Sequence, residues 1–129
     1  MSISRHVIVA VVMIYALVAC RHDNGIRIAL ANVTDDDIRC VAVLAHFVTV
    51  DLPVIPAGDT YRFTLVDTPD GGLAMAHHDM GPMMLENLLC GMHEDWSRSV
   101  GNTDLAAVSG RDRTFRCSVD GDRLACRSP

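Results

Sequence analysis

The 129-residue sequence contains no lysine, so arginine supplies all 11 of its lysine-or-arginine positions. This absence excludes a Walker-type phosphate loop, a Schiff-base lysine and a Ser–Lys nucleophile pair. The formal net charge of −5 also makes nucleic acid a poor partner. With 50% hydrophobic and 21% charged residues, the chain is neither disordered nor of low complexity, and its length suits one domain.

Motifs of hydrolytic and metal-dependent enzymes are missing too. The stretch Val108-Ser109-Gly110 lacks the preceding glycine of a nucleophile elbow, and His93 to Ser97 lacks the second histidine of a zinc-protease helix. No two cysteines have C-x-x-C spacing, so neither a redox motif nor a zinc ribbon is supported. Such a short chain also leaves little room for a deep substrate cleft. We therefore expect a protein that is not an enzyme.

The first 20 residues have the layout of a secretory signal. A polar start with Arg5 and His6 precedes an apolar run, Val7 to Val18, that is shorter than the roughly 20 residues of a membrane-spanning helix. The run leads into Leu17-Val18-Ala19-Cys20, which resembles the lipobox of bacterial lipoproteins. That resemblance implies that residues 1–19 are a signal peptide and that Cys20 carries a diacylglycerol. Residues 20–129 would then be a single mature, lipid-anchored domain; a plain secreted protein and an uncleaved short anchor are the alternatives.

The same resemblance implies a place in the bacterial cell envelope, facing the periplasm. Arg21 follows the cysteine, and by similarity to sorting in enteric bacteria the absence of aspartate there favours the outer membrane over the inner one. We expect contact with the membrane through the lipid and an envelope protein as a further partner. Removal of residues 1–19 takes away Arg5 and changes the formal charge from −5 to −6.

Assigning Cys20 to the lipid leaves an even number of cysteines: Cys40, Cys90, Cys117 and Cys126. In an oxidising compartment these predict two disulfides, with free buried thiols as the alternative. Residues 114–127 alternate in polarity around Asp120-Gly121-Asp122, as expected for a hairpin. A Gly121-Asp122 turn would place Cys117 opposite Cys126, with Cα atoms about 4.5 Å apart, whereas an Asp120-Gly121 turn would place it opposite Leu124. We predict Cys117–Cys126, which leaves Cys40–Cys90.

Strand patterns dominate the first half of the chain. Residues 26–30 alternate and should form a strand ending near Asn32, followed by a turn at residues 35–37. The apolar run from Ile38 to Val50 predicts one long central strand, and residues 60–66 predict another between turns at 55–59 and 68–72. This order resembles the first half of an immunoglobulin-like sandwich.

The second half is less regular. Pro82 and Gly91 are placed as the start and end of a helix over residues 81–91, although a buried strand over 82–90 is a rival interpretation. Residues 103–108 predict a second short helix capped by Thr103. The expected fold is therefore mainly β: a small immunoglobulin-like β-sandwich with one or two short helices, held by two disulfides.

Soft metal ligands gather between residues 75 and 93, where five of the seven methionines accompany three histidines. Thioether and imidazole groups select copper. His78-Asp79-Met80 resembles the His-x-Met element of small periplasmic copper chaperones, whose fold is also a β-sandwich. That resemblance implies copper as a cofactor. The candidate ligands are His77, His78, Met80, Met83, Met84 and His93, while core methionines and an exposed histidine loop are the alternative interpretation.

Other residues invite a choice between structure and binding. His46, inside the long apolar run, is expected to be a satisfied core or edge histidine. Arginines crowd the last 20 residues, as either a solvated strand face or a basic edge for anionic lipid or an acidic partner: Arg111, Arg113, Arg116, Arg123 and Arg127. Trp96 is a core cover or an interface anchor. The leading hypothesis is a membrane-tethered, non-enzymatic binding or accessory module of the envelope; a periplasmic copper-binding chaperone is the alternative.

Overall fold

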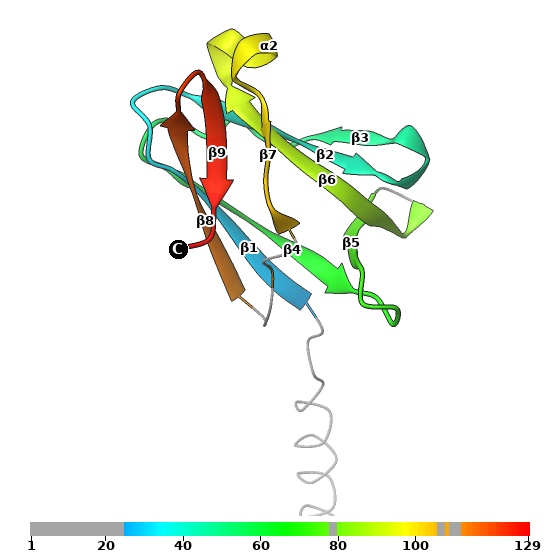
Figure 1. The fold of residues 1–129 in the computed structure, drawn as a ribbon. Helices are drawn as coiled ribbons and strands as arrows, with labels where there is room; N and C mark the ends of the chain where they lie inside the picture. The colour runs from blue at the N-terminus through cyan, green and yellow to red at the C-terminus, as the bar shows by residue number, and fades with distance from the viewer. Residues whose placement is uncertain (1–24, 78–79, 106–107, 109–111) are drawn as a thin grey trace, which may run out of the picture.

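The structure, a computed structural model, describes residues 25–77, 80–105, 108 and 112–129. Within these residues the chain is mainly β, as predicted, with one short α-helix (Figure 1). The elements are β1 (Gly25–Asn32), β2 (Ile38–Leu44), β3 (Thr49–Asp51), β4 (Thr60–Asp67), β5 (Leu73–Ala76), β6 (Pro82–Met92), α2 (Trp96–Ser99), β7 (Gly101–Asn102), β8 (Asp112–Asp120) and β9 (Arg123–Arg127). The strands pair in the order β3-β2-β6-β5-β4-β1-β8-β9, and β7 pairs with β6.

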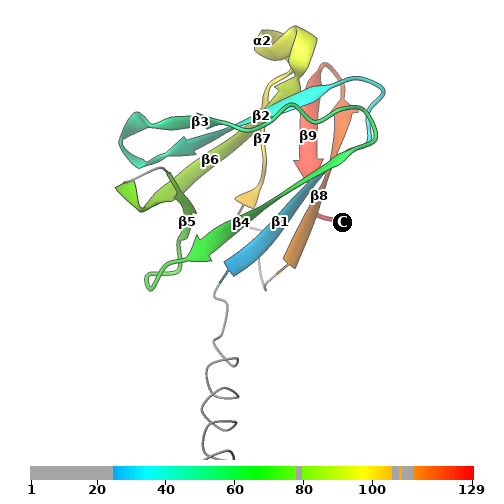
Figure 2. The ribbon, with the colours of Figure 1, turned by 180° about the vertical axis from the view of Figure 1, so that it is seen from behind.

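Strand β1 forms where the sequence predicts it and ties the beginning of the domain to its end. It pairs antiparallel with β4 and parallel with β8, so that residues 27–32 lie beside residues 112–117 (Figure 2). Ile26, Ile28 and Leu30 are buried on one side, because successive side chains of a strand point to opposite faces. The intervening positions of β1 therefore belong to the outer face of the sheet.

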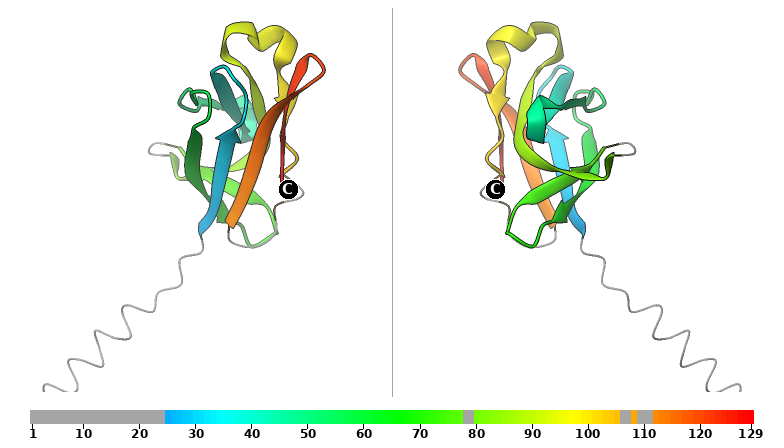
Figure 3. Two further views of the ribbon diagram at one scale, coloured as in Figure 1. Left: turned by 90° about the vertical axis from the view of Figure 1, so that its left-hand side faces the viewer. Right: turned by 90° about the vertical axis from the view of Figure 1, so that its right-hand side faces the viewer.

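Strand β6 connects two parts of the sheet. Its first residues, Pro82 to Met84, pair with β5, whereas residues from Leu85 onward pair with β2 and β7. Figure 3 shows the strands edge-on, with β1 and β8 side by side. Side chains from the strands form an apolar core. This core includes Ile28, Leu44, Leu88 and Phe115, which are fully buried and come from four different strands.

The predicted helix over residues 81–91 is wrong, and its rival, the buried strand, is right. Leu88 and Cys90 are buried at alternate positions, as in a strand. Gly91 does not end a helix but permits a close approach: a Cβ there would lie 2.9 Å from the Trp96 ring and 3.1 Å from the Ser99 hydroxyl. The glycine therefore makes room for α2, which follows this strand after a single 3-10 turn at His93–Asp95.

The predicted long strand from Ile38 to Val50 is also wrong. It divides into β2 and β3, an antiparallel hairpin joined by a 3-10 turn at Ala45–Phe47. His46 and Phe47 both have positive φ, 62° and 64°, and Phe47 is 97% exposed. His46 is exposed as well, so it is not a core histidine. An apolar run without glycine, asparagine or proline carries no turn signal, which is why the sequence pattern missed this reversal.

The helix predicted over residues 103–108 lies partly outside the described residues, within which Leu105 is in a 3-10 conformation. Thr103 and Asp104 follow β7 in irregular chain, and residues 106–107 of the predicted second helix lie outside the described residues. The helix that forms, α2, begins at Trp96, whose ring lies 4.4 Å from the guanidinium carbon of Arg39 and is only half-buried. Trp96 thus lies against Arg39 and Gly91, and it is not one of the described hydrophobic residues that pack against the core.

Asn32, at the end of β1, organises the adjoining loops from a buried position. Its Nδ2 donates to the carbonyl oxygens of Asp36 (2.8 Å) and Ile55 (2.9 Å). Its Oδ1 accepts from the Thr34 backbone N–H (3.0 Å) and hydroxyl (2.7 Å). The amide therefore has partners for both donors and two for its acceptor, which satisfies a side chain that is 1% exposed. It holds the acidic turn of residues 35–37 against the loop before β4.

Candidate functional site

Both predicted disulfides form, and each joins residues that lie directly opposite on antiparallel strands. Cys40 of β2 bonds to Cys90 of β6, with Cα atoms 4.1 Å apart. Cys117 of β8 bonds to Cys126 of β9, with Cα atoms 3.9 Å apart. Asp120 pairs with Arg123, so the turn is Gly121-Asp122, the alternative that places the two cysteines face to face. Cys20, the predicted lipidation site, lies outside the described residues.

The two disulfides lie close together in the core. The sulfur atoms of Cys90, Cys117 and Cys126 are within 4.8 Å of one another, and all three residues are buried. Sulfurs at this spacing resemble a metal cluster, but the ligand form of cysteine is the thiolate, which a disulfide does not offer. In the oxidised state the cluster is therefore part of the core, where the Thr103 hydroxyl donates to the Cys90 sulfur at 3.8 Å.

The structure disperses the predicted copper ligands along the length of β6. Met83 lies opposite Met75 of β5 and packs against the core, whereas Met84 takes the next position and is exposed. His93 follows the other end of the strand, ten residues from Met83, which corresponds to about 33 Å at about 3.3 Å per residue. Met83, Met84 and His93 therefore do not come together.

What remains of the methionine and histidine segment is the turn between β5 and β6. The Met80 N–H donates to the His77 carbonyl (3.1 Å), and the His77 N–H donates to the Gly81 carbonyl (3.3 Å). Met80 is 68% exposed at this turn. His78 and Asp79, the first two residues of the His-x-Met element, lie outside the described residues. Backbone hydrogen bonds thus hold His77 and Met80 in one turn, in which Met80 is exposed and His77 is half-buried.

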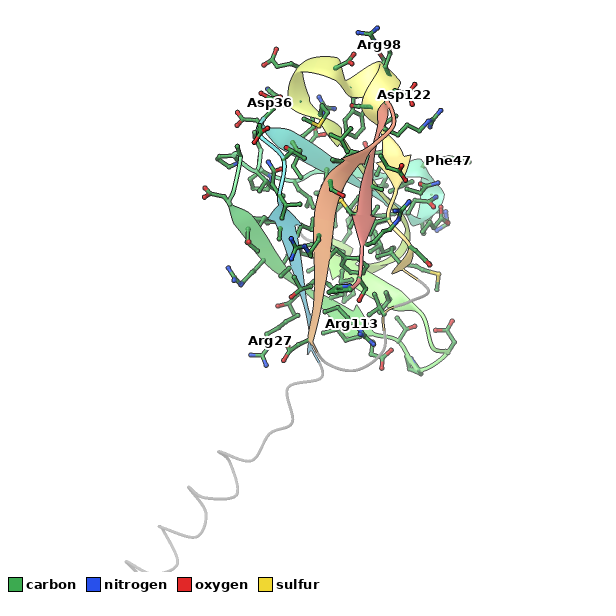
Figure 4. All side chains as sticks on the ribbon, turned by 60° about the vertical axis from the view of Figure 1, so that its left-hand side comes forward. Arg27, Asp36, Phe47, Arg98, Arg113 and Asp122 are labelled. Atoms are coloured by element: carbon green, nitrogen blue, oxygen red, sulfur yellow. A yellow bond between two sulfur atoms is a disulfide. The ribbon has the colours of Figure 1, made fainter. Side chains whose placement is uncertain are left out.

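The described domain begins only five residues after Cys20, because β1 starts at Gly25. Five residues span at most about 18 Å when fully extended. Figure 4 shows Arg27 and Arg113 toward this end of the molecule, and Asp36, Arg98 and Asp122 toward the opposite end. None of the helices in the described part of the chain has the length and apolarity required to cross a membrane.

The turn between β4 and β5 lies near the same end and is acidic. The Thr68 hydroxyl donates a hydrogen bond to the Asp70 carboxylate. This bond, together with the backbone N–H groups of Asp70 and Gly72, lowers the pKa of Asp70 below its ordinary value of 3.8. The carboxylate is therefore ionised at neutral pH, and Asp67 adds a second exposed carboxylate at the end of β4.

A hollow of about 510 Å³ opens over β4, β1 and β8. Its lining includes Arg27, Ala29, Arg62, Thr64, Asp112 and Thr114. Arg27 forms a two-pronged ion pair with Asp112, at 2.7 Å from Nε to Oδ1 and 3.2 Å from Nη2 to Oδ2. Arg27 and Arg62 are not among the residues predicted from the sequence to form a site. The signal was available, because each arginine interrupts an apolar strand at an alternate position.

The arginines of the last 20 residues do not form one group. Arg113 is half-buried and shares its strand face with Phe115, whereas Arg116 is exposed on the opposite face. Arg127 pairs with Asp120 at 2.7 Å, and Arg123 donates to the Val100 carbonyl at 3.2 Å. Arg111 lies outside the described residues. Strand alternation thus divides what the sequence presents as a single basic segment.

No protein-family model matches the chain, and no curated protein matches it. Among solved structures, the fold is similar to one described as an NMR structure of a protein from Eubacterium rectale, with a TM-score of 0.54 and 13% sequence identity. The similarity covers 83% of this chain and 90% of that chain. At this identity the likeness extends to the fold alone.

Proposed function

We propose that the protein is a lipid-tethered module of the bacterial cell envelope, with residues 1–19 as signal peptide and a diacylglycerol on Cys20. The observation that carries this proposal is the pairing of the other four cysteines with one another inside the domain. Cys20 is thereby the odd cysteine, and it precedes the first strand by only five residues. A lipid on its thiol accounts for both its position and its lack of a disulfide partner among Cys40, Cys90, Cys117 and Cys126.

The test is the processing of the full chain in a Gram-negative host. Globomycin, which inhibits the lipoprotein signal peptidase, should cause the precursor to accumulate, and Cys20→Ala should abolish labelling by radioactive palmitate. His22→Ala, a change two residues away, serves as the matched control and should be processed and labelled normally. Normal processing of Cys20→Ala into a soluble mature protein would overturn the proposal.

We also propose that the mature domain is a small immunoglobulin-like β-sandwich that acts as a periplasm-facing binding or accessory module and not as an enzyme. One apolar core with contributions from β1, β2, β6 and β8 supports the sandwich. The hollow over β1 supports the binding role. Its one lining carboxylate, Asp112, is already paired with Arg27, which argues against an enzyme. A carboxylate held in an exposed ion pair with arginine is poorly placed to act as a general base.

Copper binding stays a second candidate, now confined to the turn between β5 and β6. The observation that favours it is the exposed Met80 side chain in a turn whose backbone is hydrogen-bonded to that of His77. Cu(I) titration against a competing chelator tests it: His78→Ala and Met80→Ala should weaken binding. Met84→Ala is the control, because Met84 is an exposed methionine of β6 that lies beyond the turn. Equal affinity in all four proteins, or no binding in the wild type, would end this candidate.

A further inference from the structure

Four arginines from four neighbouring strands share the outer face of the sheet: Arg62 of β4, Arg27 of β1, Arg116 of β8 and Arg127 of β9. Strand register places them together, since residues that pair across strands lie on the same face. Arg62 pairs with Ala29, and Ala31, two positions along β1, pairs with Arg116. Arg116 in turn pairs with Arg127. We call these four residues the basic face.

The basic face is positive although the protein is acidic. Its strand positions carry two carboxylates, Asp112 and Asp120, and each is already bound to an arginine of the face. Arg62 and Arg116 are exposed and make no ion pair with a described carboxylate. The four arginines of the face therefore exceed its two carboxylates by two positive charges, whereas the chain after residue 19 has a formal charge of −6. A further arginine, Arg123, lies opposite Asp120 on the same face, and its guanidinium donates to the Val100 carbonyl.

Between its arginines the basic face carries only short side chains, some of which have hydroxyl groups that can donate hydrogen bonds. Ala29 and Ala31 occupy its centre on β1, Thr114 of β8 lies opposite Ala29, and Thr64 of β4 lies opposite Arg27. Small side chains at the centre allow a flat partner to approach the guanidinium groups. Guanidinium recognises phosphate oxygens in a two-pronged geometry, so the chemistry of the face fits a layer of phosphate groups.

The tether leaves the domain at the border of this face. Gly25 holds the same alternate position on β1 as Arg27, and the segment between Cys20 and Gly25 spans at most about 18 Å. Such a short tether keeps the domain close to the lipid surface. Either the end that contains Gly25 or one side of the domain then faces the lipid. That end presents the exposed carboxylates of Asp67 and Asp70, which anionic lipid repels. Of the arginines at the same end, Arg27 is paired with Asp112 and Arg113 is half-buried. The adjoining basic face offers attraction instead.

We propose that the basic face docks flat on the anionic phospholipid surface to which the protein is tethered, with Arg62 and Arg116 as its principal phosphate contacts. This inference rests on the proposed lipid tether. The docked domain turns the opposite side of the sheet, with β2 and β6, toward the periplasm. Phe47, at the tip of the β2–β3 hairpin, is not part of the docked surface.

Two features of the sequence allow a direct test that does not depend on biological lipidation. The four cysteines in disulfides leave Cys20 as the single thiol, and Trp96 is the single tryptophan. The core that the structure describes and both disulfides lie between residues 25 and 129, so the chain from Cys20 to Pro129 keeps them. This chain is coupled through Cys20 to a maleimide lipid in vesicles that contain a dansyl lipid, and energy transfer from Trp96 reports its height above the surface.

The expected result is a higher transfer efficiency on vesicles of phosphatidylglycerol and phosphatidylcholine than on phosphatidylcholine alone. Trp96 begins α2, at the end of the molecule opposite the tether (Figure 3). An upright domain holds it away from the lipid by more than the length of β1, about 26 Å, and a docked one brings it nearer. Arg62→Gln with Arg116→Gln should abolish the rise, as should 1 M salt, where the screening length is about 3 Å.

Arg98→Gln is the control, because it removes an exposed arginine of α2, which lies at the end of the molecule opposite Arg27 and is not part of the basic face. It should keep the rise, and thermal unfolding should be unchanged in every variant. Equal transfer on both vesicle types, or an unaltered rise in the Arg62→Gln, Arg116→Gln protein, would overturn the inference. Loss of the rise in Phe47→Ser alone would overturn it in favour of an inserted apolar tip. Retention of the free chain on an anionic glycan without any rise on vesicles would assign the face to a polysaccharide instead.

The two proposals fail separately. If globomycin has no effect while the coupled chain docks through Arg62 and Arg116, then the proposed lipidation of Cys20 is wrong and the proposed docking of the basic face holds. If Cys20 is lipidated but transfer does not depend on lipid charge, then the face is wrong and the tether stands.

Discussion

The hairpins β8–β9 and β2–β3 reverse the chain in similarly tight turns by different means. In β8–β9 the turn is Gly121-Asp122, with the positive φ of 66° on a glycine, and a disulfide joins the two strands. In β2–β3 the positive φ values belong to His46 and Phe47, and the disulfide of β2 joins it to β6 instead of to its hairpin partner. One hairpin is specified locally, whereas the other depends on the body of the protein to hold β2.

Removal of the disulfides should produce the largest losses of stability, and the losses should differ between the two hairpins. In the chain-entropy account, a bond stabilises more as the loop it closes lengthens. Cys40–Cys90 closes 50 residues and Cys117–Cys126 closes 9, so the double alanine variants should lose about 4 and about 2.5 kcal/mol of unfolding free energy, respectively. Urea unfolding measures both losses. A larger loss of unfolding free energy on removal of Cys117–Cys126 would contradict the prediction that Cys40–Cys90 stabilises the fold more.

Gly121→Ala should weaken the β8–β9 hairpin by about 1 kcal/mol, because an L-residue with a Cβ is disfavoured in the left-handed region. An added Cβ at this position meets no atom within 4 Å, so the cost is conformational and not a clash. The midpoint of urea unfolding gives the change. Ser118→Ala on the same hairpin, at an exposed strand position, is the control and should be near neutral.

The reciprocal change, Phe47→Gly, should stabilise the β2–β3 hairpin by about 0.5 kcal/mol, since relief of the left-handed conformation slightly exceeds the entropy that glycine adds to the unfolded chain. Phe47 is 97% exposed, so its removal sacrifices almost no packing. The same urea measurement reports it. Destabilisation would show that the Phe47 ring contributes to the folded state in a way that its exposure conceals.

A third reversal, between β4 and β5, extends the comparison to pH and should show the smallest effect. Folding lowers the pKa of Asp70, chiefly through the hydrogen bond from the Thr68 hydroxyl. The resulting stabilisation is present above the unfolded pKa, near 3.8, and is lost as the pH falls through the lower folded value. Asp70→Asn and Thr68→Val should therefore lose less stability than the wild type between pH 7 and pH 3. Parallel acid-unfolding curves for all three proteins would refute this.

Local chemistry explains which predictions succeeded. Alternation identified β1, β4 and the β8–β9 hairpin, and glycine with aspartate identified the turns around residues 58, 71 and 121. The even number of cysteines after Cys20 and the geometry of the β8–β9 hairpin were sufficient to predict both disulfides. The helix predicted over residues 81–91 failed because Pro82 and Gly91 suit helix ends but here serve strand β6 and the packing of Trp96.

The two candidate sites also differ in whether local sequence or tertiary structure brings their residues together. The methionine and histidine segment is compact in sequence, but an extended strand separates its ends, because a strand rises about 3.3 Å per residue whereas a helix rises 1.5 Å. The basic face shows the reverse: Arg27, Arg62 and Arg116 are far apart in sequence, and only strand pairing collects them. No local pattern contains that pairing.

The sequence by itself determined the β-rich class, the two disulfides and the expectation of a lipid tether, since these depend on alternation, cysteine count and contiguous residues. Tertiary structure decided the reversal at His46-Phe47, the burial of Asn32 among loop carbonyls and the face shared by Arg62 and Arg116. The physical reason is the range of the interaction. Turn chemistry and alternation act over a few residues, whereas register between strands depends on how the whole core closes.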